Sequence, residues 1–192
     1  WNMFLDHQLQ VVAGTDFDVE FQHHKLHYRF RSAESNGNKI LFTRNCWECE
    51  EGIFVMNADG TGVGQLTNNP SQILQPSFRT GDYDPVWSPD GNKIAFERVS
   101  DSCCWSAIFV MNADGTGIEQ LTDNDSYHSM PVWSPDGKKI AFERGPGIFV
   151  MNADGTGIEQ LTDPRRPKSH DWDSDPVWSP DGKKIAFEGL RG

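Results

Sequence analysis

Residues 131–143 read PVWSPDGKKIAFE, and residues 148–162 read IFVMNADGTGIEQLT. Both stretches recur nearly unchanged along the 192-residue chain, with PVWSPDG at 85–91 and 176–182 and IFVMNADGTG at 53–62 and 108–117. Consecutive Pro-Asp-Gly triplets lie 46 and 45 residues apart. Repeats of this length indicate a chain that folds as a row of similar units, each packed against its neighbours.

Each unit carries the signals of four short strands. A Val-Trp pair forms the first, and Ser-Pro-Asp-Gly at 134–137 supplies a tight turn, because proline presets φ, aspartate bonds its own backbone and glycine accepts positive φ. The second strand follows at 139–143. The third, at 148–151, is apolar on both faces, which predicts a strand covered by neighbouring units. An Asn-Ala-Asp-Gly turn then leads to an alternating, half-exposed fourth strand at 158–161.

Units of 40–45 residues with four short strands are typical of a β-propeller. No segment shows the 3.6-residue apolar period of a helix, and glycine or proline interrupts every apolar run. Strand number alone also permits a flat sandwich, but near-identical units of this length favour blades. We therefore predict an all-β chain, a β-propeller of four-stranded antiparallel blades. About four blades belong to this chain, as a whole ring or as part of a larger one.

The repeat resembles PD40, the WD40-like unit of TolB-like propellers, over residues 36–188. The resemblance rests on PVWSPDGKKIAFE followed by IFVMNADGTGIEQLT, in three nearly identical copies. The first unit is degenerate, because 36–42 keep the second strand and lack the Trp-Ser-Pro before it. We expect 28–31 to take the place of that first strand. The chain is thus predicted to be one domain over 1–192, with divergent strands at 1–35.

The last unit is incomplete. The sequence stops after its second strand, 183–188, so the outer edge of that strand needs a partner. The apolar segment 1–5 and the strand-like segment 9–13 can supply the third and fourth strands and close a four-bladed ring. TolB-like propellers usually have six blades, so a fragment of a larger ring and strand donation between molecules both stay open.

The formal net charge is −11, from 28 acidic and 17 basic side chains. Such a surface repels nucleic-acid phosphates and anionic lipids, so we expect neither as a partner. No apolar run approaches the roughly 20 residues of a transmembrane helix, so no membrane insertion is expected. The first residue is Trp1 and not methionine, and we expect a processed or truncated product.

Four cysteines lie in two loops that each join a second strand to a third. Cys46 and Cys49 share one loop, and Cys103 and Cys104 share the next. We predict disulfides, because secreted propellers commonly carry them. A zinc site of four thiolates is an alternative, although adjacent cysteines seldom reach one ion, and free thiols are a third possibility.

Loop length varies at one face of the predicted propeller, where second strands lead to third strands and fourth strands lead to the next unit. The other face has short, uniform turns, so we place the binding face at the variable loops. Its candidate residues are Asp82, Tyr83, Asp84, Tyr127, His128, His170, Asp171, Trp172, Asp173 and Asp175. No nucleophile motif or phosphate loop accompanies the two histidines, so we interpret each as a solvated loop residue.

Alternating Asp171, Asp173 and Asp175 resemble the first half of a calcium-binding loop. The glycine and the distal glutamate of such a loop are missing, so we favour an acidic loop that caps its own turns. Calcium is the one candidate cofactor, and otherwise none is expected.

The resemblance implies a non-catalytic scaffold that binds a protein or peptide, in the periplasm or outside the cell. Two alternatives stay open. Terminal strands can join chains into an oligomer or filament, as in a structural subunit. A metal-dependent enzyme, as some TolB-like lyases are, can use His128, His170 and loop carboxylates. Propellers host all three classes, so the fold does not choose among them.

Overall fold

The computed structural model describes residues 17–20, 27–31, 38–45, 52–68, 81–99, 105–162 and 172–189. All regular structure in these ranges is β-strand. The strands are β1 (Phe17–Glu20), β2 (His27–Arg31), β3 (Lys39–Asn45), β4 (Gly52–Asn57), β5 (Gly64–Gln65), β6 (Gly81–Trp87), β7 (Lys93–Val99), β8 (Ser106–Asn112), β9 (Glu119–Gln120), β10 (His128–Trp133), β11 (Lys139–Arg144), β12 (Gly147–Asn152), β13 (Glu159–Gln160), β14 (Asp173–Trp178) and β15 (Ile185–Gly189). No helix in the described ranges could cross a membrane.

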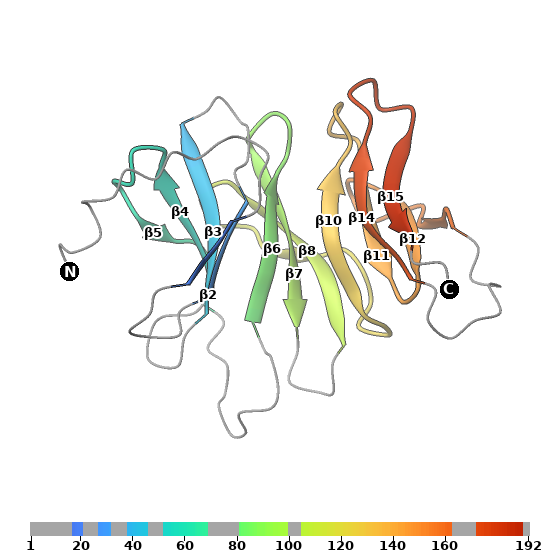
Figure 1. Cartoon of the computed structure of the whole chain (residues 1–192), viewed down its shortest axis with the longest axis horizontal. Coiled ribbons are helices and arrows are strands. Elements are labelled where there is room, and N and C mark those ends of the chain that lie inside the picture. Colours follow the sequence, from blue (N-terminus) through green and yellow to red (C-terminus); the bar gives the residue numbers. More distant parts are fainter. Residues whose placement is uncertain are drawn as a thin grey trace.

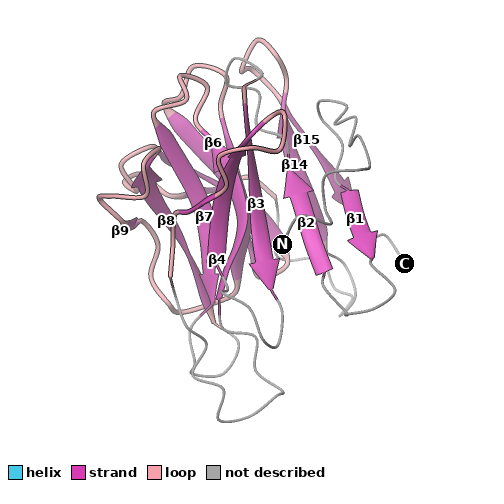
Figure 2. Cartoon of the chain, turned by 90° about the vertical axis from the view of Figure 1, so that its left-hand side faces the viewer, coloured by secondary structure: helices cyan, strands magenta, loops and turns pink. Residues whose placement is uncertain are grey.

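The strands form four antiparallel sheets that stand side by side as blades (Figure 1). Blade 1 is β1-β2-β3-β4-β5, blade 2 is β6-β7-β8-β9, blade 3 is β10-β11-β12-β13, and blade 4 is the pair β14-β15. The loops gather at the two ends of the blades (Figure 2). Since strand order follows chain order in every sheet, each blade is a simple meander. The predicted propeller architecture is confirmed.

Corresponding strands of the four blades carry the same letter. Strand A is β2, β6, β10 and β14, strand B is β3, β7, β11 and β15, strand C is β4, β8 and β12, and strand D is β5, β9 and β13. The place of strand A in blade 1, expected at 28–31, is taken by β2, which pairs with β3. No sequence motif indicated β1, which extends blade 1 to five strands. Segments 1–5 and 9–13 lie outside the described residues.

The repeated tryptophans occupy equivalent positions, as predicted. Trp87, Trp133 and Trp178 each pair with the first isoleucine of strand B, which is Ile94, Ile140 or Ile185. Trp87 and Trp133 are buried between blades, whereas Trp178 is half-buried.

The Ser-Pro-Asp-Gly turn joins strands A and B identically in blades 2, 3 and 4. In blade 3 the Ser134 hydroxyl donates to Asp136, and the Gly137 amide donates to the Ser134 carbonyl. Gly137 has a φ of 70°, a conformation that costs glycine little. The turn therefore fixes the register of the A–B pair through local bonds.

Apolar clusters fill the first two junctions between blades, with the same positions used at both. Between blades 1 and 2 lie Leu41, Ile53, Trp87, Ile94, Phe96 and Met111, with Val55, Leu66, Phe109 and Ala113 packed against them. Between blades 2 and 3 lie Ala95, Ile108, Val110, Trp133, Ile140, Phe142 and Met151, with Val86, Leu121, Phe149 and Ala153 packed against them. Burying one such side chain fully stabilises the fold by about 1.5–3 kcal/mol, so blade stacking is the main source of cohesion.

Candidate functional site

A β-bulge interrupts strand A in blades 2, 3 and 4. The bulged residues are Asp84, Met130 and Asp175, with φ values of 48°, 50° and 53°. Positive φ is uncommon for a residue with a side chain, and most uncommon for methionine among these three. Because of the bulge, strand A begins several residues before the Pro-Val-Trp segment. The strand is therefore longer than its sequence suggested.

This extension corrects the placement of the candidate binding residues. Six of these candidates were expected in loops and instead belong to strands β6, β10 and β14, namely Asp82, Tyr83, Asp84, His128, Asp173 and Asp175. Asp82, His128 and Asp173 occupy one equivalent position and are 1%, 1% and 4% exposed. The prediction of a solvated His128 is therefore wrong. An extra residue at the bulge reverses the alternation of the strand and turns this position inward.

Asp82 forms a buried ion pair with Arg98. Arg98 Nε donates to Asp82 Oδ1 at 2.6 Å, and Nη2 donates to Oδ2 at 2.9 Å. The Asp82 side chain is fully buried, and the guanidinium also lies over the rings of Phe96 and Phe109. The forked, fully bonded geometry is the kind that compensates a buried carboxylate. We assign Asp82 a structural role.

His128 takes the place of Asp82 in blade 3 and ties β10 to blade 2. Its Nδ1 donates to the Ser106 carbonyl at 2.8 Å, while the Ser106 hydroxyl donates to the His128 carbonyl at 2.7 Å. Burial lowers the pKa of His128, and Arg144 lowers it further, against opposing effects of Ser106 and Asp125. The neutral imidazole is thus the favoured form in the folded chain.

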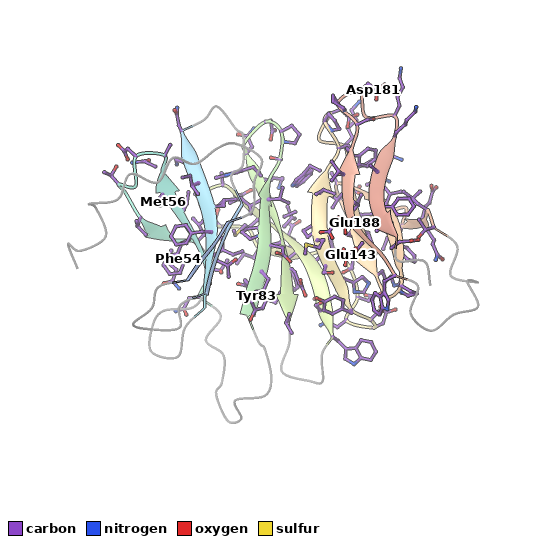
Figure 3. The ribbon with its side chains drawn as sticks, viewed as in Figure 1. Phe54, Met56, Tyr83, Glu143, Asp181 and Glu188 are labelled. Atoms are coloured by element: carbon purple, nitrogen blue, oxygen red, sulfur yellow. The ribbon has the colours of Figure 1, made fainter. Side chains whose placement is uncertain are left out.

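Glu97, Glu143, Asp84 and Asp175 are neighbouring carboxylates on strands A and B, and we call them the carboxylate row. Glu143 Oε1 accepts the Asp175 amide at 2.8 Å, and Oε2 accepts the Ser129 hydroxyl at 3.0 Å. Burial raises the pKa of Glu143 against the lowering effect of the Asp175 and Ser129 bonds, and the charges of Asp175 and Asp84 add smaller increases. Figure 3 labels Glu143 within the inter-blade side chains and Tyr83 toward the lower end of β6.

Tyr127 connects this row to solvent. The residue is 43% exposed, yet partial burial and the nearby charge of Glu97 raise the pKa of its hydroxyl, with smaller effects of Asp84 and Glu143. Ser129 bonds the same hydroxyl. Tyr127 therefore lies between the carboxylate row and solvent.

Two more aromatic side chains are exposed at this end of the blades. Trp105 precedes β8, and Trp172 precedes β14, each 44% exposed. The Ser106 hydroxyl accepts the His128 amide, so the starts of β8 and β10 lie together. The Asp173 amide donates to the carbonyl of Pro146, which lies in the turn between β11 and β12, so the start of β14 lies at the same end. It is the lower end in Figure 1. We call Trp105, Tyr127 and Trp172 the aromatic rim.

Sequence reasoning found two members of the rim and missed Trp105. It also missed Glu97 and Glu143, although the Ala-Phe-Glu motif recurs at both and was a usable signal. His170, Asp171 and the four cysteines lie outside the described residues. Of the calcium candidates, Asp173 is buried and Asp175 is exposed on one strand. Within the described ranges, no group of three acidic, histidine or cysteine side chains is suited to a metal ion.

The blades and their repeated turns agree with a known protein family. The family model for PD40, the TolB beta propeller domain, matches residues 19–145. The chain belongs to the PD40 family. The PD40 propeller shares its fold with solved TolB structures.

The putative TolB from Agrobacterium tumefaciens matches at 21% identity with a TM-score of 0.63, over 86% of this chain and 63% of that one. TolB from Acinetobacter baumannii matches at 20% identity with a TM-score of 0.62, over 88% and 44%. An oligogalacturonate lyase in complex with manganese matches at 16% identity with a TM-score of 0.59, over 82% and 43%. No curated protein sequence matches.

These likenesses concern the fold alone, because all three identities are low. The PD40 chain spans less than two thirds of each of these structures. They include both TolB proteins and an enzyme, so a shared propeller does not select a function.

Proposed function

We propose that this PD40 propeller is a non-catalytic binding module that takes a protein or peptide partner at the aromatic rim. The observation that carries the proposal is the exposure of Trp105, Tyr127 and Trp172 together at one end of the blades. Aromatic side chains with an apolar body and a polar tip are enriched where proteins bind one another.

Two carboxylates behind the rim, Asp82 and Glu143, have structural partners, which is consistent with a binding module. Asp82 is fully engaged by Arg98, and Glu143 accepts bonds from Asp175 and Ser129. Each of these bonds links two strands, so the two side chains brace the part of the propeller that holds the rim.

The acidic balance of the chain favours a basic or neutral partner. A net charge of −11 repels acidic surfaces and steers basic ones toward the protein. Family membership and the TolB likenesses are consistent with a scaffold of the periplasm or the extracellular space, and we propose that location.

The test is selection of peptides from a random phage-displayed library on the immobilised chain, followed by calorimetry. We expect the variants Trp105→Ala and Trp172→Ala each to weaken a selected peptide at least tenfold. Ile118→Ala is the matched control, since Ile118 is 40% exposed next to β9. This variant should bind the selected peptide with the affinity of the parent chain. Equal affinity for rim variants and control would place the binding surface elsewhere.

A further inference from the structure

His128 joins two members of the aromatic rim. It directly follows Tyr127, and it pairs with Ser106, the residue after Trp105. The Ser106 hydroxyl accepts the His128 amide at 2.9 Å and donates to the His128 carbonyl at 2.7 Å. The Ser106 carbonyl accepts the imidazole Nδ1 at 2.8 Å. Because a carbonyl oxygen only accepts, Nδ1 carries the proton of the neutral ring and Nε2 carries the lone pair.

The Nε2 atom faces a carboxylate that is bound to another side chain. Asp125 Oδ1 lies 3.8 Å from Nε2, which is too long for a hydrogen bond. The second oxygen, Asp125 Oδ2, accepts Arg144 Nη2 at 2.6 Å. The His128 side chain is 2% exposed, whereas those of Asp125 and Arg144 are 52% and 31% exposed. An ion pair this exposed contributes little stability, so a new charge at Nε2 can compete for the carboxylate.

Within blade 3, Arg144 is the charged side chain on the His128 face. The two residues are directly opposite each other on β10 and β11. The imidazole also packs on Phe142, with ring centroids 5.8 Å apart. The next pair, Ser129 and Glu143, projects from the opposite face of the blade, where Glu143 bonds blade 4. Glu143 therefore does not face the imidazole.

The strands of the neighbouring blades carry further charged groups. On β7 of blade 2, Glu97 lies close enough to Tyr127 for its charge to raise the pKa of that hydroxyl. Asp82 and Arg98 of the same blade are bound to each other. In blade 4, Asp173 is buried at the start of β14. The charges that act on the imidazole itself are those of Asp125 and Arg144, described above.

Three contacts hold the segment that carries Tyr127. The Ser106 amide donates to the Ser126 carbonyl at 3.2 Å, and the Gly145 amide donates to the Tyr127 carbonyl at 3.1 Å. The third contact is the ion pair of Asp125 with Arg144. It is the contact of the three that depends on charge. Since Asp125 is two residues before Tyr127, a change of its partner is transmitted to the rim.

We propose that His128 is a pH-sensitive positioning residue of the aromatic rim, whose protonation moves Tyr127 and weakens partner binding. The proposal rests on the proposed function, because the rim is the binding surface. One proton from solvent adds to Nε2, and Asp125 exchanges Arg144 for the new imidazolium. A charge-assisted hydrogen bond replaces the 3.8 Å approach, and Arg144 turns to solvent. The rim thus holds its partner at neutral pH and releases it in acid.

The pH range follows from the surroundings of the ring. Burial lowers the pKa of His128 most, and the charge of Arg144 lowers it further. The Ser106 carbonyl, Asp125 and the Ser126 carbonyl oppose this by favouring the protonated ring. The net shift is downward from 6.5, so the change in the rim belongs below that pH.

The first experiment observes the switch without any partner. The chain has three tyrosines and six histidines, so NMR spectra with ¹³C-labelled tyrosine and histidine rings are simple. The variants Tyr127→Phe and His128→Gln identify the two signals. We expect both signals to shift with one common midpoint below pH 6.5. In His128→Gln the corresponding shift of Tyr127 should be absent, and any effect of Glu97 on the tyrosine should persist.

Two substitutions in the segment before β10 separate the switch from general effects of charge. Asp125→Asn keeps His128 but removes the carboxylate that it attracts, so the shift of Tyr127 at the histidine midpoint should be lost. Asp123→Asn is the matched control, because Asp123 is exposed two residues earlier in the same segment. This variant should titrate as the parent does. Circular dichroism at each pH establishes that the chain is folded.

The second experiment measures the affinity of a rim-binding peptide that lacks histidine and acidic residues. Between about pH 7.5 and pH 5, the parent should lose about fivefold or more, the lower end of ordinary coupling between sites. The ratio of the two affinities should be close to one in His128→Gln. Failure to select any peptide would contradict the proposed function, and the tyrosine spectra would still decide whether the switch exists.

Three results would overturn the proposal. The first is a His128 that titrates while the Tyr127 signal stays in place. The second is a His128 that stays neutral until circular dichroism shows unfolding. The third is a peptide affinity with the same pH dependence in the parent and in His128→Gln. Each would leave His128 as a structural residue of the junction between blades 2 and 3.

Discussion

The backbone amide of Asp175 donates a 2.8 Å hydrogen bond to Oε1 of Glu143, which joins the bulge of blade 4 to the B strand of blade 3. Asp175 has a φ of 53°, so the bond stabilises a backbone conformation that a non-glycine residue seldom adopts. Glu143 also accepts the Ser129 hydroxyl of its own blade. One buried carboxylate thus fixes the spacing of two neighbouring inner strands.

The first prediction is that Glu143→Ala lowers the free energy of unfolding by about 1–3 kcal/mol, the cost of leaving buried donors without an acceptor. Urea denaturation at pH 7 measures it. Glu188 is the matched control, because it occupies the same position in blade 4 and is exposed. Glu188→Ala should change the value by less than about 0.5 kcal/mol. Equal effects at the two sites would mean that Glu143 contributes no more than a surface carboxylate.

The second prediction concerns the pH dependence of stability. Burial lowers the pKa of His128 below its ordinary value of 6.5, so on acidification the unfolded chain takes up a proton before the folded chain does. That uptake favours unfolding, and the contribution of His128 is lost as the pH falls below 6.5. The variant His128→Gln should therefore lose less stability than the parent between pH 7 and pH 5.

Glu143 acts in the opposite direction. Burial raises its pKa above 4.5, so its contribution to stability declines as the pH rises through the interval above that value. The difference between the parent and His128→Gln isolates the histidine, because Glu143 is present in both. Unfolding free energies at half-unit pH steps give the two curves, and parallel curves would contradict the assignment of a neutral His128.

The third prediction compares two arginines. Arg98→Ala leaves the fully buried Asp82 carboxylate without its partner and should destabilise the fold by about 3–5 kcal/mol. Arg144 occupies the same position in blade 3, but its partner Asp125 is 52% exposed. Arg144→Ala should cost at most about 1 kcal/mol, as for other surface pairs. Similar losses for both variants would contradict the distinction drawn from burial.

The repeat made most of the fold predictable. PVWSPDG and IFVMNADGTG carry turn chemistry and apolar alternation at fixed spacing, and these local signals determine the A–B turn and the B–C register. The first blade was harder, since β2 lacks the Trp-Ser-Pro motif. β1 was missed because its four residues carry no repeat signal.

The candidate site was less predictable because it depends on the bulge. Asp84, Met130 and Asp175 share a positive φ but not a residue type, so no sequence pattern indicates it. One inserted residue moves His128 from the expected solvated loop to a buried strand position. Whether a side chain at such a position is buried depends on the neighbouring strands, and these strands come from other parts of the sequence.

The last prediction concerns the inner-strand tryptophans. Trp87 and Trp133 are 6% and 8% exposed, and neither indole nitrogen has a hydrogen-bond partner in the described part of the chain. The Trp178 indole is more exposed and donates to the Val132 carbonyl at 3.2 Å. The first two side chains therefore act through packing alone, while the third combines partial packing with one bond.

Truncation to alanine at Trp87 or Trp133 should cost about 3–5 kcal/mol, the usual loss for a buried aromatic side chain. Phenylalanine at either position should cost clearly less than alanine, because it keeps a ring in the junction and removes an unpaired buried donor. Trp178→Ala should cost less than Trp133→Ala, since its junction has an open cleft. Denaturant unfolding of these variants measures the differences. If Trp178→Ala proved as costly as Trp133→Ala, the third junction would have to be as tightly packed as the other two.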